Sequence, residues 1–229
     1  MEDFAIVMFS CDKNDDLWPI FNHCLNKYWK DHPTIYMFTE TKKCNLFKTI
    51  NFDYPLDKWT VRMRKSLAKV KENKILFICD DCFLREKVNY KKLNEALALL
   101  KDDVVSIQLE LSISKFDVKT EHKGFRKKTQ YSPYIVSFFC GLWQKDKLIE
   151  MLDGESDPWT RENTADNKGY TYYQICDDKI ISWFNDATGK NGALKYGEWQ
   201  DGIYDFLEKE GLEDDVDFSK RRFVSQRKQ

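Results

Sequence analysis

The sequence predicts an α/β protein built around a mainly parallel sheet, and three observations support this prediction. The run ILFICDDCFL at residues 75–84 joins an uninterrupted apolar stretch to two aspartates, which is typical of a strand buried on both faces. Similar runs alternate with segments of helical periodicity, as in parallel sheets with right-handed crossovers. The length of 229 residues suits one large domain without an internal linker.

Strands and helices are expected to alternate through the first half of the chain. Apolar runs predict strands at residues 4–9, 35–38, 46–52, 75–79 and 104–111. Apolar residues at helical spacing predict helices at residues 17–28, 59–70 and 93–100. Asp16 is expected to cap the first of these helices, and Pro19 is tolerated in its first turn. This half of the chain therefore has the pattern of a nucleotide-binding α/β unit.

The second half contains longer polar stretches. Residues 115–132 are rich in lysine and arginine and are expected to form a surface loop, with closure over an anionic ligand as the alternative. The pattern then predicts an apolar-aromatic strand within 134–143, helices at 145–152 and from Pro158, a strand at 180–184, a glycine-rich loop at 185–199 and a helix at 199–207. Residues 211–229 are expected to be a frayed, charged tail behind a domain of residues 1–210.

Composition and charge limit the classes of partner. The net charge of −1 arises from 37 basic and 38 acidic residues, so no global field would attract nucleic acid or a membrane. The 7 cysteines are odd in number and have no framework spacing, as expected for reduced thiols. The sequence shows neither a signal peptide nor an apolar stretch of spanning length. A cytoplasmic protein that binds no nucleic acid is therefore expected.

Asp80 and Asp81 are the strongest candidate ligands for a metal. They follow the strand expected at residues 75–79, and ligands of open α/β sheets bind beyond the carboxyl ends of the strands. Paired carboxylates at such an edge suit a hard divalent cation. The alternative is a solvated turn that caps the next helix.

The order of the motifs resembles a known family. A WxxR helix at Trp59 and Arg62, a strand ending in DDxFL, a PWxxE turn at residues 158–162 and a Gly-Lys loop before Trp199 are similar to bacterial GT-A-fold glycosyltransferase-like proteins of capsule or lipopolysaccharide biosynthesis. The resemblance covers residues 4–199. It implies a single-domain, GT-A-like, Rossmann-type, mainly parallel mixed sheet flanked by helices. It also implies sugar transfer from a nucleotide-diphosphate sugar, foremost a UDP-sugar, to a glycan or lipid-linked acceptor.

The resemblance implies that Asp80 and Asp81 hold Mn²⁺ or Mg²⁺. Such an ion acts as a Lewis acid on the departing diphosphate. Cys82 departs from a strict D-x-D spacing. Two arrangements therefore stay open: Asp80 contacts the ribose while Asp81 holds the metal, or the reverse.

Further contacts to the nucleotide sugar are expected at the ends of the strands and in the loops. Ser10 and Asp12 follow the first expected strand and Glu40 follows the second, at edges that hold base and ribose in folds of this type. Arg62 is expected to pair with phosphate or to hold the aspartates, with an exposed helical arginine as the alternative. Lys190 is expected to reach the diphosphate when its loop closes, with loop solubility as the alternative.

The resemblance places the acceptor chemistry in PWTRE. An inverting transferase needs a general base, and Glu162 matches the family's late acidic residue. Asp157 and Glu155 are the nearest rivals, and a solvated helix start is the structural alternative. Trp159 is expected to stack on the acceptor sugar, or to belong to the core.

Two rival functions remain open on the sequence. Cys79 and Cys82 form a C-x-x-C after a strand, as in thioredoxin-like oxidoreductases, although the two acids between them would raise the thiol pKa. A zinc site on the same cysteines lacks a second ligand pair. A non-catalytic nucleotide- or glycan-binding domain is the other rival. The basic tail, Lys220, Arg221, Arg222, Arg227 and Lys228, offers peripheral membrane contact, with a solvated end as the alternative.

Overall fold

The computed structural model describes residues 3–54, 56–184 and 192–225. Its contacts divide the chain into two compact units that interleave along the sequence. The first unit comprises Met1–Asp12, Pro33–Cys79 and Asn89–Ile180, and the second comprises Lys13–His32, Asp80–Val88 and Ile181–Gln229.

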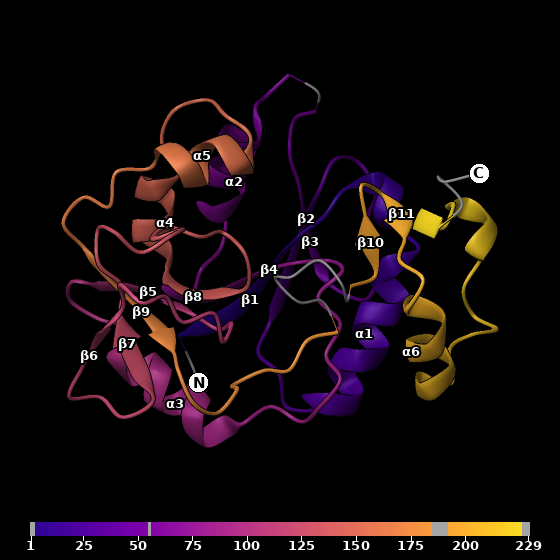
Figure 1. Ribbon diagram of the computed structural model, residues 1–229. Coiled ribbons are helices and arrows are strands. Elements are labelled where there is room, and N and C mark those ends of the chain that lie inside the picture. The colour runs from indigo at the N-terminus through magenta and orange to yellow at the C-terminus, as the bar shows by residue number, and fades with distance from the viewer. Residues whose placement is uncertain (1–2, 55, 185–191, 226–229) are drawn as a thin grey trace. The chain divides into compact units, whose positions relative to one another are not determined.

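The first unit contains one large mixed sheet. Its strands are β1 (Phe4–Phe9), β2 (Ile35–Thr39), β3 (Lys48–Asn51), β4 (Lys74–Cys79), β5 (Val104–Gln108), β6 (Val118–Lys119), β7 (Phe125–Lys127), β8 (Gly141–Gln144) and β9 (Thr171–Ile175). Their order is β3-β2-β1-β4-β8-β5-β9-β7-β6 (Figure 1). The first four strands of this order are mutually parallel, as are β5 and β9, whereas β8 runs antiparallel between β4 and β5. The expected mainly parallel sheet flanked by helices is confirmed.

Helices cover both faces of this sheet. The helices α2 (Trp59–Leu67), α4 (Lys145–Met151) and α5 (Pro158–Thr164) group on one face, and α3 (Tyr90–Leu99) lies on the other (Figure 1). Alternate residues of β1 and β4 join α2 and α4 in one buried cluster that includes Ala5, Val7, Ile75, Phe77, Met63, Leu67, Leu148 and Met151. Burying each large apolar side chain contributes about 1.5–3 kcal/mol, which fixes α2 against the strands.

The helix expected from Pro158 begins where predicted. The Asp157 carboxylate accepts a hydrogen bond from the Thr160 amide at 2.9 Å. Pro158 occupies the first turn, where its missing N–H costs nothing. The sequence thus determines the start of α5 locally.

The second unit contains α1 (Leu17–Tyr28), the hairpin of β10 (Leu194–Lys195) and β11 (Glu198–Trp199), α6 (Ile203–Glu210) and the 3-10 turn η2 (Phe218–Lys220). The buried Glu210 ties α6 to α1, because its carboxylate accepts hydrogen bonds from Lys27 Nζ at 2.8 Å and the Tyr28 hydroxyl at 2.7 Å. The Phe206 ring stacks on Phe184 at 4.3 Å between centroids.

Two expected strands need correction. Only Gly141–Gln144 of the run at 134–143 is a strand, because Tyr134 and Cys140 have φ angles of 49° and 34°, which an extended strand cannot adopt. Residues 180–184 form a single bridge between Leu84 and Trp183 instead of a ladder.

Other elements differ from the expectation as well. Strand β9 is not predicted by the sequence, and the stretch expected to be a loop at 115–132 contains β6 and β7. The last helix begins at Ile203, since Trp199 pairs with Leu194 in the β10-β11 hairpin.

The segment expected to fray is packed as far as residue 225. The Trp199 amide donates to the Arg222 carbonyl at 2.8 Å, and the Phe218 ring contacts the Trp199 ring at 5.8 Å. Arg221 is 7% exposed at its side chain. The expectation of a frayed end is therefore wrong for residues 211–225. Within the part of the chain that the structure describes, every helix is too short or too polar to cross a membrane.

Candidate functional site

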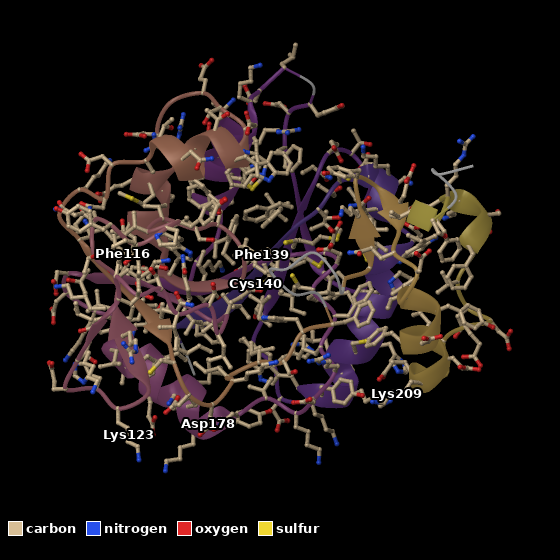
Figure 2. The ribbon with its side chains drawn as sticks, viewed as in Figure 1. Phe116, Lys123, Phe139, Cys140, Asp178 and Lys209 are labelled. Carbon is tan, nitrogen blue, oxygen red and sulfur yellow. The ribbon has the colours of Figure 1, made fainter. Side chains whose placement is uncertain are left out.

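The carboxyl ends of β1, β4 and β5 lie at one edge of the sheet in the first unit. Because β8 is antiparallel to these strands, it begins at this edge, where Gly141 pairs with Phe77 and Gln108. The segment 134–140, which precedes β8, therefore reaches the same edge. Figure 2 shows Phe139 and Cys140 where the chain enters β8.

Glu162 is bonded to this segment. Its Oε1 accepts a hydrogen bond from the Phe138 amide at 2.6 Å. The Phe138 ring lies 5.5 Å from the Trp59 ring, which lies 6.0 Å from Phe9, the last residue of β1. Burial raises the pKa of Glu162, opposed by hydrogen bonds from the Phe138 amide and the Ser137 hydroxyl. A half-buried carboxyl with a raised pKa at a strand edge is suited to proton transfer.

Lys128 anchors the start of the same segment. This buried lysine donates hydrogen bonds to Gln108 Oε1 and to the Tyr134 carbonyl, each at 2.7 Å. Burial lowers the pKa of Lys128 to about 8, against the opposing effect of the negative charges of Asp117 and Glu162. The segment 134–140 is thus held at Tyr134 by Lys128 and at Phe138 by Glu162.

The left-handed backbone at both ends of this segment is a sparsely populated conformation. A non-glycine residue in such a conformation costs on the order of 1–3 kcal/mol and persists only where its surroundings impose it. Tyr134 and Cys140 both have this conformation. Strained backbone of this kind concentrates at functional sites, which agrees with the position of Glu162.

The carboxylates of Asp12 and Glu40 each accept hydrogen bonds from the loop that contains the other residue. The Asp12 carboxylate accepts hydrogen bonds from the Thr39 hydroxyl at 2.8 Å and from the amides of Thr41 and Lys42 at 3.0 Å, while the Asp12 amide donates to the Glu40 carboxylate. Burial acts to raise the pKa of Asp12, but hydrogen bonds from Thr41, Lys42 and Thr39 outweigh it and hold that pKa well below its usual range. Both carboxylates thus join the loops that follow β1 and β2.

Arg62 and Ser10 also lie in the first unit. The Arg62 guanidinium lies over the rings of Phe52 at 4.9 Å and Tyr54 at 5.3 Å, as in cation–π contacts. The Ser10 amide donates to the Phe38 carbonyl at 2.8 Å. Lys190 lies outside the described residues. Nucleotide contacts by these residues stay predictions.

Trp159 and Asp157 flank the first turn of α5. Trp159 is 73% exposed, and it stands three residues before Glu162, so both lie on the same side of the helix. Asp157 is exposed, and hydrogen bonds from the Thr160 amide and hydroxyl lower its pKa. Its capping bonds give Asp157 a structural role, and they leave Glu162 as the stronger candidate base.

Asp80 and Asp81 belong to the second unit and follow directly on β4 in the chain. Asp80 is 5% exposed, and its Oδ2 accepts a hydrogen bond from Asn14 Nδ2 at 2.9 Å. Asp81 is half-buried, with a carboxylate oxygen within 4.8 Å of the Cys82 sulfur. Two consecutive carboxylates offer the hard oxygen ligands that Mn²⁺ and Mg²⁺ prefer. The Cys82 sulfur beside Asp81 is a soft ligand that such cations do not prefer, so metal binding by the two aspartates stays a prediction.

Several site residues are not predicted by the sequence. Asn14 bonds to Asp80, and Gln108 and Lys128 bond to the segment 134–140, but no motif or periodicity singles these three residues out. A cleft of about 510 Å³ also opens beside α3, between Lys92, Glu95, Lys123 and Asp178. Figure 2 shows Lys123 and Asp178 beside that helix. None of the predicted site residues that the structure describes lines this cleft.

Comparisons with known proteins identify the fold. No family model and no curated protein matches the sequence. The structure of S. aureus TarS 1–349 is similar with a TM-score of 0.50 and 12% identity, over 78% of this chain and 59% of that chain. The mannosyltransferase PcManGT from Pyrobaculum calidifontis, in complex with GDP-Man and Mn²⁺, is similar with a TM-score of 0.52 and 8% identity, over 82% of this chain and 59% of that chain. The CMP:2-keto-3-deoxy-manno-octonic acid synthetase complexed with CTP is similar with a TM-score of 0.51 and 12% identity, over 93% of this chain and 99% of that chain. This chain thus spans about three fifths of the length of the TarS and PcManGT chains. It has the GT-A-like fold shared by glycosyltransferases and nucleotidyltransferases.

Proposed function

We propose that this protein is a metal-assisted glycosyltransferase that moves a sugar from a nucleotide-diphosphate sugar to a hydroxyl of a glycan or lipid-linked acceptor. The observation that carries the proposal is Glu162, a half-buried carboxyl with a raised pKa that is fixed to the strand edge by the Phe138 amide. The GT-A-like fold and the order of the sequence motifs support it. UDP-sugars are the first donor class to test, and the synthesis of a polysaccharide is the proposed setting.

Glu162 is proposed as the general base. As the acceptor oxygen bonds to the anomeric carbon, the acceptor proton passes to the Glu162 carboxylate. The bond from the anomeric carbon to the diphosphate breaks on the opposite face, so the product has inverted configuration. Trp159, exposed one helical turn before Glu162, is proposed to stack on the acceptor sugar.

Asp80 and Asp81 are proposed to hold Mn²⁺ or Mg²⁺. When bound, such an ion neutralises charge that develops on the departing diphosphate. Ser10, Asp12, Glu40 and Arg62 are proposed to contact the nucleotide sugar. For Asp12 and Glu40 this contact is made by the loops that their carboxylates join, since those carboxylates already accept hydrogen bonds.

Nucleotidyl transfer is the second candidate function. It is favoured by the similarity to the CTP-bound synthetase, which extends over 93% of this chain and 99% of that chain. In that reaction a nucleoside triphosphate would be attacked at its α-phosphorus, and pyrophosphate would leave. The two candidates therefore differ in the nucleotide that binds and in the product released.

Nucleotide binding tests the proposal. We expect UDP or another nucleoside diphosphate to raise the melting temperature in the presence of Mn²⁺, because a ligand that binds only the folded state stabilises it by about 2.7 kcal/mol at a hundred times its Kd. Asp81→Asn should abolish the Mn²⁺-dependent part of this shift. The exposed Asp214 supplies the control, and Asp214→Asn should behave like the parent.

The same panel should include GDP, CMP, dTDP and CTP, each with and without Mn²⁺. A shift with CTP alone would favour nucleotidyl transfer. No shift with any nucleotide, or a shift that Asp81→Asn leaves unchanged, would contradict the proposed metal site.

A further inference from the structure

Arg221 forms a buried ion pair in a segment that the sequence presents as a basic tail. Its Nε and Nη2 donate to the two Asp16 carboxylate oxygens at 2.8 and 2.6 Å, and the two side chains are 7% and 5% exposed. The guanidinium also lies 5.6 Å from the Trp199 ring centroid and donates to the Gly197 carbonyl at 3.2 Å. A bidentate, buried arginine of this kind is a fixed structural group rather than a mobile surface charge.

The guanidinium determines the orientation of the Asn14 amide. Arg221 Nη2 donates to Asn14 Oδ1 at 2.9 Å and to the Lys13 carbonyl at 2.8 Å. A guanidinium has donors only, so it requires the oxygen of the Asn14 amide to face it. The amide nitrogen must then point away from Arg221, and it donates to Asp80 Oδ2 at 2.9 Å.

This orientation matters because Asp80 is buried. An ionised carboxylate accepts hydrogen bonds and cannot donate them, and a buried one needs donors to offset the loss of water. A flipped Asn14 amide would direct its oxygen at Asp80 and lose the hydrogen bond from Asn14 Nδ2. Arg221 therefore holds the Asn14 amide in the orientation that fixes the Asp80 carboxylate.

We propose that Arg221 is a positioning residue that acts through Asn14 to hold Asp80 in the geometry for binding a divalent metal. The proposal rests on the proposed function, and it makes the C-terminal segment part of the support of the metal site. The negative charge of Asp16 offsets the positive charge of Arg221. We therefore assign Arg221 this positioning role in place of the membrane contact expected for the basic tail. The second sphere of a metal site typically contributes a factor of 10–100 in metal affinity.

Mn²⁺ affinity, measured by electron paramagnetic resonance of the free ion, tests the inference. Arg221→Met and Asn14→Ala should each weaken Mn²⁺ binding about tenfold or more. The double variant should bind about as weakly as the weaker single variant, because both remove the same link. Lys220→Met removes a neighbouring exposed cation and should bind Mn²⁺ like the parent.

Hydrogen exchange supplies a second measurement that needs no metal. In Asn14→Ala, the amides of residues 80–84 should exchange faster than in the parent, and in Lys220→Met they should not. Should Arg221→Met fail to fold, Arg221→Lys takes its place. Lysine keeps the charge but cannot donate the paired hydrogen bonds of a guanidinium, and Mn²⁺ binding should weaken by the same factor.

The two proposals fail in different ways. A parent protein that binds no Mn²⁺ contradicts the proposed metal site itself. A parent that binds Mn²⁺ while Arg221→Met and Asn14→Ala bind it equally well overturns the positioning role alone. Additive losses in the double variant, or unchanged exchange at residues 80–84, overturn it as well.

Discussion

Glu162→Gln is expected to lower the rate of sugar transfer by a factor of about 10² to 10⁴, the usual contribution of a general base. Glutamine keeps an oxygen that can accept the Phe138 amide hydrogen bond, which is 2.6 Å long in the native protein. The segment 134–140 should therefore keep its position while the ability to take a proton is lost. The measurement is the release of nucleoside diphosphate from a nucleotide sugar in the presence of Mn²⁺, with water or a simple sugar as acceptor.

A control variant and a stability measurement accompany this prediction. The exposed Glu155 lies in the loop before α5, and Glu155→Gln should keep the parent rate within about twofold, since it makes no comparable bond to the strand edge. The melting temperature of Glu162→Gln should stay close to that of the parent. A folded Glu162→Gln protein with full activity would show that another group takes the proton.

The free energy of unfolding should depend on pH through Lys128, with an effect on the order of 3 kcal/mol. Burial lowers its pKa from 10.5 to about 8 in the folded protein, so the unfolded chain binds more protons between these values. Stability therefore rises with pH across this window. Below pH 8 both states carry the charge, and the full cost of burying it is present.

Urea unfolding of the parent and Lys128→Met from pH 7 to 10 measures this effect. Methionine has a similar shape without the charge. The free energy of unfolding of the parent should therefore rise relative to that of Lys128→Met as the pH rises. Lys127→Met, at the neighbouring exposed position, should show no such trend. A pH-independent difference for Lys128→Met would mean that Lys128 keeps an ordinary pKa in the folded state.

The central strands were predictable because their apolar runs are long and unbroken. Strand β4 is expected at 75–79 and observed at Lys74–Cys79, with its inner residues buried. Strand β9 is likewise paired on both sides, by β5 and β7, but its Thr171 and Gln174 interrupt the apolar pattern. Their side chains are bonded to Asp103 Oδ2 at 2.7 Å and to the Glu110 carbonyl at 2.6 Å. Tertiary partners therefore made β9 possible, and no local pattern reveals them.

The site was predictable only where a motif lies in one stretch of sequence. Asp80, Asp81 and Glu162 follow from such motifs, and their functions await the tests above. Asn14 bonds to Asp80 across 66 residues, and Arg221 bonds to Asp16 across 205. The expectation of a solvated tail was wrong for Arg221 because its counterion Asp16 and its ring partner Trp199 come from other segments of the chain. Contacts of this kind become visible only in the folded chain.

The product released from a nucleotide substrate tests the central claim most directly. The protein should be incubated with Mn²⁺ and either a panel of UDP-, GDP- and dTDP-sugars or CTP with a sugar acid, and the liberated phosphates should be identified. Glycosyl transfer predicts a nucleoside diphosphate from one nucleotide sugar, at a rate that falls in both Asp81→Asn and Glu162→Gln. Pyrophosphate from CTP, or no product from any nucleotide sugar, would contradict it.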